Sequence, residues 1–405
     1  MLFCVLSGFS SGLPLYVLYQ MVPAWLRDRG VDLGTIGLFS LISFPYTWKF
    51  AWSPLMDRVA LPLGRRRGWA LLTQGVLFAA LAALSAFDAG EQTRQVAAVA
   101  FIVALFSASQ DIVLDAWRRE VLPDRELGLG NSVFVNAYRI SSLVPGSLAL
   151  ILADHLPWSQ VIRVVAAFMV VGILTTLWMP EPRVPPAPTR TLAAAVLDPF
   201  REFFRRNGLG PALLILLFML LYKLGDSMAT ALSTPFYLDT GFTKTQVGSI
   251  AKAAALWSSI TGGIVGGLIM VRAGINRSLW LFGVVQIVSI LGFWLLAVTG
   301  PNEWLLFAVV SFEYLGVGMG TAAFVAFIAR STHRAHTATQ LALLTSLTGV
   351  PRTFANATTG YIVQAVGYPA FFLLCTAIAL PGMLLLPLVA PWGDDPAADE
   401  EPGIR

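Results

Sequence analysis

Ionisable side chains interrupt stretches of the chain that are otherwise strongly apolar. They are Lys49, Asp111, Asp115, Arg139, Lys223, Asp226, Lys252, Glu313 and Arg352. A charged side chain at the centre of a membrane-spanning helix costs about 2.5–3.5 kcal/mol, even on the most lenient insertion scale. Summed over this set, the cost exceeds the net stability of about 5–15 kcal/mol that folded proteins have. These side chains must therefore pair or line a hydrated cavity, as solute-binding and ion-coupling groups do.

The acidic side chains are candidates for carrying a proton. Asp111 and Asp115 are four residues apart and so share a helix face. Two carboxylates this close resist being ionised together, and a carboxyl group that exchanges its proton near neutrality is what proton coupling needs. The alternative for Asp115 is an ion pair with Arg118 or Arg119 at the rim of the membrane. Asp111 lies one turn deeper and Glu313 stands alone in its apolar stretch, so these two are the better candidates.

Basic side chains in the same stretches are candidates for binding an acidic solute. Arg139 and Arg352 occupy matching places in the two halves of the chain, and the guanidinium fork grips a carboxylate at two points. The alternative is that each arginine neutralises an acidic residue of its own half. Lys223 and Asp226 are three residues apart on one helix face. This spacing predicts either a neutralised pair or a gating or binding element, and it adds Asp226 to the proton candidates.

Aromatic and amide side chains within the spans suggest recognition of a sugar, which commonly combines a stacking platform with amide hydrogen bonds. Together with the basic groups, the predicted substrate-binding residues are Tyr46, Lys49, Gln110, Asn136, Tyr138, Arg139, Lys223, Lys252 and Arg352. Most aromatic residues in membrane spans face lipid or the interface, and this is the alternative for each tyrosine.

The composition indicates a protein that lives in a bilayer. Hydrophobic residues make up 56% of the chain, charged residues make up 12%, and the mean hydropathy is +0.71. Soluble domains carry about 25% charged residues. The apolar runs are about 20 residues long, which is the length of a helix that crosses the hydrocarbon core. Because backbone in lipid must satisfy its own hydrogen bonds, and no run alternates as a barrel strand would, the predicted fold is all-α and polytopic.

Other function classes lack their residue patterns in this sequence. Cys4 and Cys375 both lie in apolar runs, which argues against a disulfide framework, and no Cys/His spacing suits a metal. No nucleophile–base set predicts an enzyme, and no phosphate-binding loop with its lysine predicts direct use of ATP. The basic residues do not cluster as a nucleic-acid face. We therefore expect no cofactor, no metal and no nucleic-acid partner, and we expect the proton gradient to supply the energy.

The apolar runs predict twelve transmembrane helices. They lie near 2–25, 34–55, 69–88, 95–116, 128–153, 160–179, 210–236, 245–270, 278–299, 303–329, 338–364 and 369–389. Alternate loops carry most of the arginines, and the positive-inside rule puts these loops and both termini in the cytoplasm. The opposite loops carry only Arg27, Arg29, Arg94 and Lys244. We predict a multi-pass protein of the bacterial inner membrane, and we expect a monomer.

Two related halves organise these spans. Asp28, Gly30 and Gly37 recur as Asp239, Gly241 and Gly248 at a constant offset of 211 positions, and Arg139 matches Arg352 at an offset of 213. Offsets near half the chain length fit two parallel six-helix repeats. The predicted domains are a six-helix half over 1–179, a cytoplasmic linker with a short amphipathic helix over 180–209, a second six-helix half over 210–390, and an acidic disordered tail over 391–405.

The loop after the second span resembles the signature loop of the major facilitator superfamily. The residues that carry the resemblance are Asp57-Arg58 and Gly64-Arg65-Arg66-Arg67. Ser53 replaces the usual glycine before the aspartate, and the gap to Gly64 is wider than in the family. The resemblance implies two six-helix halves that rock around a central cavity. The residues that it implies as a cytoplasmic gate are Asp57, Arg58, Arg65 and Arg66.

A closer resemblance, over nearly the whole chain, is to the AmpG-type muropeptide permeases. The segments that carry it include Ser11-Gly-Leu-Pro14, Pro45-Tyr-Thr-Trp-Lys-Phe50, Trp52-Ser-Pro-Leu-Met-Asp-Arg58, Ser109-Gln-Asp-Ile-Val-Leu-Asp-Ala-Trp-Arg118, Pro235-Phe-Tyr-Leu-Asp239 and Gly274-Ile-Asn-Arg277. What this family does is import anhydromuropeptides from periplasm to cytoplasm with the proton gradient. Import feeds peptidoglycan recycling and, in some bacteria, the induction of β-lactamase.

The resemblance therefore predicts a proton-coupled importer of a small glycopeptide. Peptide carboxylates are expected at Lys49, Arg139, Lys252 and Arg352, the sugars at Gln110 and Asn136, and the proton at Asp111 or Glu313. One alternative is a major facilitator transporter of another amphipathic or anionic solute, such as a drug or an acyl-CoA-like anion. A second alternative is a membrane enzyme or receptor that transports nothing.

Overall fold

The structure is a computed structural model of the chain, and it describes residues 1–182, 201–331 and 337–393. Within these ranges the side chains are described except at positions 50, 54, 57, 58, 124, 125, 127, 128, 329 and 337–348. The named elements of the described part are all helices, in agreement with the predicted all-α fold. Two compact units form: unit 1 comprises Met1–Thr189 and Thr234–Ala253, and unit 2 comprises Arg190–Ser233 and Ala254–Arg405.

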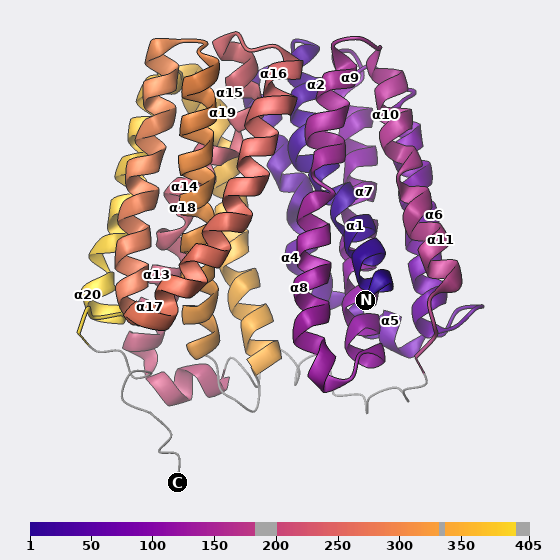
Figure 1. Cartoon of the computed structure of the whole chain (residues 1–405), viewed down its shortest axis with the longest axis horizontal. Coiled ribbons are helices and arrows are strands. Elements are labelled where there is room, and N and C mark those ends of the chain that lie inside the picture. Colours follow the sequence, from indigo (N-terminus) through magenta and orange to yellow (C-terminus); the bar gives the residue numbers. More distant parts are fainter. Residues whose placement is uncertain (183–200, 332–336, 394–405) are drawn as a thin grey trace. The chain divides into compact units, whose positions relative to one another are not determined.

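Unit 1 combines long helices with short helical segments (Figure 1). Its elements from the first part of the sequence are α1 (Leu2–Tyr16), η1 (Val17–Met21), α2 (Val22–Asp28), α3 (Leu33–Leu38), η2 (Phe39–Ser43), α4 (Phe44–Trp48), η3 (Lys49–Ala51), α5 (Ser53–Arg58), α6 (Arg65–Leu84), α7 (Thr93–Val121), α8 (Asp124–Ile140), η4 (Val144–Leu148), α9 (Ala149–Ala153), α10 (Trp158–Ala167) and α11 (Met169–Trp178). Later residues add α15 (Ser233–Thr240), α16 (Lys244–Gln246) and η5 (Val247–Ala251). Helix α1 packs against α7, α8 and α11, so it is surrounded by helices.

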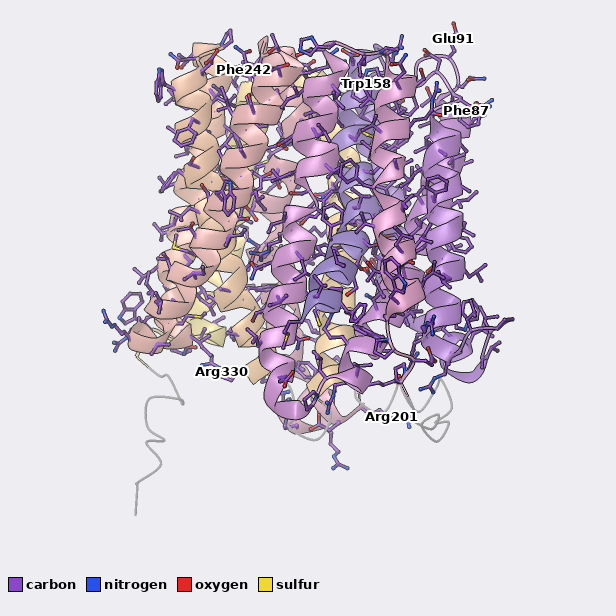
Figure 2. The ribbon with its side chains drawn as sticks, turned by 45° about the vertical axis from the view of Figure 1, so that its right-hand side comes forward. Phe87, Glu91, Trp158, Arg201, Phe242 and Arg330 are labelled. Atoms are coloured by element: carbon purple, nitrogen blue, oxygen red, sulfur yellow. The ribbon has the colours of Figure 1, made fainter. Side chains whose placement is uncertain are left out.

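Unit 2 is built from fewer and longer elements. They are α13 (Leu209–Tyr222), α14 (Leu224–Ala231), most of α17 (Lys252–Thr299), α18 (Glu303–Arg330), α19 (Thr337–Leu384) and α20 (Leu386–Val389). Aromatic rings join α13 to α18: Tyr222 stacks on Phe324 with centroids 5.8 Å apart, and Phe218 meets Phe327 at 5.1 Å. Figure 2 shows Arg201, in a helical stretch over 201–207, and Arg330 at the same end of this unit.

The number of spans follows from where the long helices bend. Within the described residues, nine helical stretches are long and apolar enough to cross a membrane. Two of them contain a glycine with positive φ, Gly274 at 78° and Gly367 at 77°. Glycine alone adopts this conformation without strain, so the direction of the helix changes there and each stretch supplies two spans. The predicted span near 34–55 is broken into α3, η2, α4, η3 and α5. The stretches that contain Gly274 and Gly367 count as two spans each, and the broken region near 34–55 counts as one more. The nine stretches therefore give the predicted twelve spans.

The internal repeat has the same local conformation in both copies. Gly30 follows α2 with φ 77°, and Gly241 follows α15 with φ 107°. The amides at positions 30 and 31 bond to the carbonyls of Arg27 and Leu26, and those at 241 and 242 bond to Leu238 and Tyr237. Two residues after each glycine, a side chain caps the next helix: Asp32 accepts from the Thr35 amide at 2.9 Å, and Thr243 from the Gln246 amide at 3.1 Å. The two segments are therefore equivalent helix–turn–helix units.

Parts of the predicted domain scheme lie outside the described residues. Residues 183–200 of the linker and 394–405 of the tail are among them. The described end of the linker is helical over 201–207, whereas the amphipathic character of this helix and the disorder of the tail stay predictions. The boundary between six-helix halves also stays a prediction. Residues 234–253 follow that boundary in sequence, yet they pack within unit 1.

Glycines on α1 allow α8 to approach closely. A Cβ atom added at Gly12 would overlap the carbonyl oxygen of Tyr138, and one added at Gly8 would lie 3.0 Å from the Cα of Phe134. Small residues four positions apart are typical of closely packed membrane helices. This contact sets how far α1 stands from α8, and so where the polar side chains of α1 lie.

We expect Gly12→Ala to destabilise the protein by about 1–3 kcal/mol, because the added methyl group overpacks a backbone contact. Gly75→Ala on α6 is the control, since nothing lies within 4 Å of a Cβ added there. The control should stabilise its helix by about 0.5–1 kcal/mol through the lower backbone entropy of alanine. Thermal unfolding of the purified variants in detergent measures both effects. A Gly12→Ala variant as stable as the control would contradict the close contact of α1 with α8.

Candidate functional site

A first candidate site in unit 1 is centred on Asp111 of α7. The Ser11 hydroxyl of α1 donates a hydrogen bond to Oδ1 of Asp111, and Lys49 of η3 is a cation whose charge acts on the same carboxylate. The neighbouring residue, Gln110, is fully buried, and neither Oε1 nor Nε2 has a hydrogen-bond partner among the described residues. Helix α7 therefore carries a carboxylate with a donor and a cation, next in sequence to an amide that is free to bond.

Tyrosines gather round this carboxylate. Tyr138 of α8 interacts electrostatically with Asp111, with Tyr46 of α4 and with Tyr16 of α1. The rings of Tyr16 and Tyr138 meet edge to face with centroids 5.8 Å apart. Tyr46, Lys49, Asp111 and Tyr138 were all predicted site residues, and α4, η3, α7 and α8 bring them together. The sequence could not show this convergence, because these elements are separate in the chain.

Two other predicted residues of unit 1 lie at its surface. Asp115 has a half-exposed side chain, and its Oδ1 accepts from Arg118 at 2.9 Å, which is the ion-pair alternative for this residue. Asn136 is exposed, and its amide donates to a carbonyl of its own helix at 2.9 Å. Neither side chain shares the partly buried surroundings of Asp111.

The paired arginines of the repeat have different environments. Arg139 of α8 is partly buried, and its charge acts on Tyr16 of unit 1. Arg352 of α19 in unit 2 is exposed. No ion pair of either arginine is found among the described residues. The alternative in which each neutralises an acidic residue of its own half therefore has no support in the described part of the chain.

Lys252 is a buried lysine of unit 1, with only 8% of its surface exposed. Its Nζ donates to the Thr234 hydroxyl at 2.5 Å, and its aliphatic stem packs beside Gly146 of η4. Among the described residues no carboxylate forms an ion pair with it. A buried ammonium group with only a neutral oxygen as partner is in an unfavourable state. This position can therefore receive an anion.

Unit 2 contains a second set of buried charges. Lys223, at the break between α13 and α14, places Nζ 2.8 Å from Oδ2 of Asp226 and donates to Oε1 of Gln286 on α17 at 2.7 Å. Glu313 of α18 is 0% exposed, and its polar neighbours are Asp226 and Ser289. The predicted pair of Lys223 with Asp226 is present, and the structure adds Gln286 and Glu313 to it.

One end of unit 1 is held together by ion pairs between distant segments. Nε of Arg27 lies 2.5 Å from Oδ1 of Asp239, and Nζ of Lys244 lies 2.9 Å from Oδ1 of Asp28. A longer contact of 3.8 Å joins Lys244 to Asp154. The cavity that these five residues line with Leu238, Phe242 and Thr243 has a volume of about 350 Å³. Figure 2 shows Glu91, Trp158 and Phe242 at this end.

Sequence reasoning missed these pairs, although the repeat contained a signal for them. The paired residues are 212 and 216 positions apart, so no helical spacing connects them. Asp28 and Asp239 are the repeat-related aspartates, and the structure gives each of them a basic partner. A repeated charged residue at the end of a span was therefore the available clue.

Arginines at the start of α6 are bound by two glutamates. Arg66 donates to both carboxylate oxygens of Glu120 on α7, at 2.6 and 3.0 Å, and Arg65 adds a contact of 3.1 Å. The backbone amides of Arg66 and Arg67 each donate to the carboxylate of Glu181 at 2.9 Å. An anion at a helix N-terminus satisfies amides that have no partner within the helix. These contacts hold α6, α7 and the chain after α11 together within unit 1.

The predicted gate is only partly described by the structure. Arg65 and Arg66 have their carboxylate partner in Glu120 of the same unit. The side chains of Asp57 and Arg58 lie outside the described residues. Gating by Asp57, Arg58, Arg65 and Arg66 therefore stays a prediction.

We expect Glu120→Gln to destabilise the protein by about 3–5 kcal/mol, because it leaves a buried guanidinium group without its carboxylate. The side chain of Arg66 is only 5% exposed. The control is Glu202→Gln, whose partner Arg206 is 34% exposed at 3.6 Å. Loss of such a partly exposed and longer pair should change stability by about 0–1 kcal/mol. Unfolding in detergent compares the two variants, and equal losses of stability would contradict the structural role of Glu120.

Comparison with known proteins places this arrangement in a family. A family profile described as Major Facilitator Superfamily matches residues 4–355. An anhydromuropeptide permease of Escherichia coli K12 is 44% identical over 94% of this chain and 78% of its own length. The chain belongs to the AmpG-type branch of the Major Facilitator Superfamily. A second relative, an uncharacterized protein of Haemophilus influenzae, is 49% identical to this AmpG-type chain over 96% of it and 94% of the relative. A putative transporter AmpG 1 of Rickettsia prowazekii is 29% identical over 94% of the chain.

Solved structures agree with the family in fold. The crystal structure of the nucleoside transporter NupG matches with a TM-score of 0.76 and 13% identity, covering 96% of this chain and 99% of that one. A D-xylose-proton symporter matches with a TM-score of 0.74 and 10% identity, covering 95% and 96%. The predicted major facilitator fold is confirmed. The AmpG-type chain is a multi-pass membrane transporter and not an enzyme, as the sequence predicted.

Proposed function

We propose that this AmpG-type transporter imports anhydromuropeptides, which are GlcNAc-1,6-anhydro-MurNAc peptides, from the periplasm to the cytoplasm for peptidoglycan recycling. The observation that carries the proposal is the 44% identity, over 94% of the chain, to a protein named as an anhydromuropeptide permease. Such a substrate has peptide carboxylates and sugar hydroxyl groups. Its passage through apolar helices therefore requires buried cations and free hydrogen-bonding groups.

In this proposal Lys252 is the principal cation for a peptide carboxylate. What supports this role is that Lys252 is buried and that its bonded partner, Thr234, is neutral. A bound carboxylate would give the ammonium group the charged partner that it lacks in the described part of the chain. Lys49, Arg139 and Arg352 are proposed as further cations along the passage.

The sugars are proposed to bind near Asp111. The Gln110 amide supports this assignment, because both its donor and its acceptor lack protein partners among the described residues. Tyr46 and Tyr138 lie beside the same stretch of α7, and their rings are proposed to stack on the sugar rings. Asn136 is proposed as an additional contact, one that needs the glycan to extend to the exposed part of α8.

Import is proposed to use the proton gradient and to cross the inner membrane, with both termini in the cytoplasm and the protein acting as a monomer. The arginine-rich loops support this orientation through the positive-inside rule. An inward-moving positive charge gains about 2.3 kcal/mol per 100 mV of membrane potential. In this orientation, the ion pairs of Arg27 with Asp239 and of Lys244 with Asp28 lie on the periplasmic side. There they would close the passage while the substrate leaves to the cytoplasm.

Uptake of labelled anhydromuropeptide into energised, right-side-out membrane vesicles tests the function directly. We expect accumulation that depends on expression of the protein and that a protonophore abolishes. Unlabelled wall fragments should compete with the label, whereas acyl-CoA and drug molecules should not. Competition by an acyl-CoA or a drug alone would favour the rival solute, and accumulation untouched by the protonophore would refute proton coupling.

We expect Lys252→Met to weaken substrate binding about 10- to 100-fold, since a hydrogen bond to a charged group is worth about 1.5–3 kcal/mol. The readout is the substrate concentration that gives half-maximal uptake. Lys252→Arg keeps the charge and should restore much of the affinity. Arg94→Gln, a change at an exposed position in the first turn of α7, is the control for removal of a positive charge. An unchanged concentration dependence in Lys252→Met would remove this lysine from the site.

A further inference from the structure

Two carboxyl groups of unit 2 share a buried space that has too few donors for both to be ionised. Glu313 of α18 is 0% exposed, and Asp226 of α14 is 6% exposed. The two groups are close enough for Asp226 to act on Glu313. Oδ1 of Asp226 and both carboxyl oxygens of Glu313 are buried, and no N–H or O–H group of the described residues donates to them in regular geometry. A carboxylate without donors is among the least favourable groups in an apolar interior.

The hydrogen bonds of the polar neighbours on α17 go to groups other than Glu313 and Asp226. Gln286 accepts from Lys223 through Oε1 and donates through Nε2 to the carbonyl of Phe282 at 3.1 Å. The Ser289 hydroxyl donates to the carbonyl of Gln286 at 2.9 Å. While the Ser289 hydroxyl donates to that carbonyl, its oxygen can only accept a hydrogen bond from Glu313. A hydrogen bond from Glu313 to either Ser289 or Asp226 then requires a proton on the carboxyl pair itself.

The groups on the other packed helices do not supply a further charge. The Tyr222 hydroxyl of α13 donates to the carbonyl of Leu279 at 2.8 Å. Helix α19 contributes the buried Cys375 thiol near Glu313, and Asn356, whose amide bonds to Ser227 at 3.1 Å. Lys223 is therefore the cation of this cluster within the described residues. With two ionised carboxylates the cluster carries one net negative charge, whereas with one added proton it is neutral.

We propose that Asp226 and Glu313 share one exchangeable proton, held opposite Lys223, and that this pair is the proton-coupling site of the transporter. The inference deepens the proposed function and rests on it. In each cycle one proton passes from periplasmic water to the pair and later to cytoplasmic water, with no covalent bond between heavy atoms made or broken. Gln286 acts as a positioning residue that fixes the direction of Lys223. Asp111 differs from the pair, because the Ser11 hydroxyl donates a hydrogen bond to its Oδ1.

Amide variants separate proton coupling from substrate translocation. Glu313→Gln and Asp226→Asn each place a permanent N–H donor between the two side chains and so imitate the protonated pair. In reconstituted vesicles we expect both variants to keep exchange of internal for external anhydromuropeptide, which needs no net proton movement. We expect both to lose accumulation driven by a proton gradient, so that the inside and outside concentrations become equal. Glu91→Gln, at an exposed loop position, is the matched control and should accumulate substrate like the wild type.

A spectroscopic measurement tests the shared proton without transport. Infrared spectra of the purified protein at neutral pH should show the carbonyl stretch of a buried protonated carboxyl group. This band should disappear in Glu313→Gln and shift or disappear in Asp226→Asn. A band that stays in both variants and is lost in Asp111→Asn would overturn the inference and assign the proton to Asp111. Driven accumulation by Glu313→Gln would overturn it as well. A wild type that accumulates nothing under a proton gradient would instead refute the proposed function, and the infrared band would still decide whether the proton is shared.

Discussion

The desolvation of charge is the physical constraint on which the rest of this structure depends. An ionised group that leaves water requires an opposite charge and donors of suitable geometry, and each unit meets this requirement with different residues. In unit 1, Glu120 binds the almost fully buried Arg66 at two points. In unit 2, Lys223 is held between Asp226 and Gln286. Lys252 departs from the pattern, because its hydrogen-bond partner Thr234 is neutral. This departure is what gives it a proposed role toward the substrate.

Close packing of helices makes such specific pairing possible. Gly8 and Gly12 let the backbone of α1 approach α8, which leaves the adjacent Ser11 able to reach Asp111 on α7. At the start of α6, Gly64 has φ 113° and its neighbours turn their amides toward Glu181. Small residues therefore do more than fill space, since they set the distances at which the polar groups meet. A methyl group added at Gly12 would separate α1 from α8 and so disturb the surroundings of Asp111.

Fold and function rest on different observations in this protein. Structures of a nucleoside transporter and a D-xylose-proton symporter share its fold at 13% and 10% identity. Such similarity shows that the helices are arranged alike, but different solutes cross proteins of this fold, so it does not identify the solute. The muropeptide proposal comes from a relative that shares 44% of its residues. Lys252, with the neutral Thr234 as its bonded partner, and the Gln110 amide, which has no partner among the described residues, then indicate which groups of this chain could meet a carboxylate and a sugar.

Sequence by itself determined the helical membrane character, the repeat and the pair of Lys223 with Asp226. These features depend on hydropathy and on spacing within one helix, both of which are local. The tertiary structure decided that Glu313 joins Asp226, that Arg27 meets Asp239, and that Asp115 lies at the surface with Arg118 while Asp111 lies among tyrosines. Such contacts depend on the order, rotation and bending of helices far apart in the chain. Those quantities arise from the packing of all the helices together, so no local pattern of residues contains them.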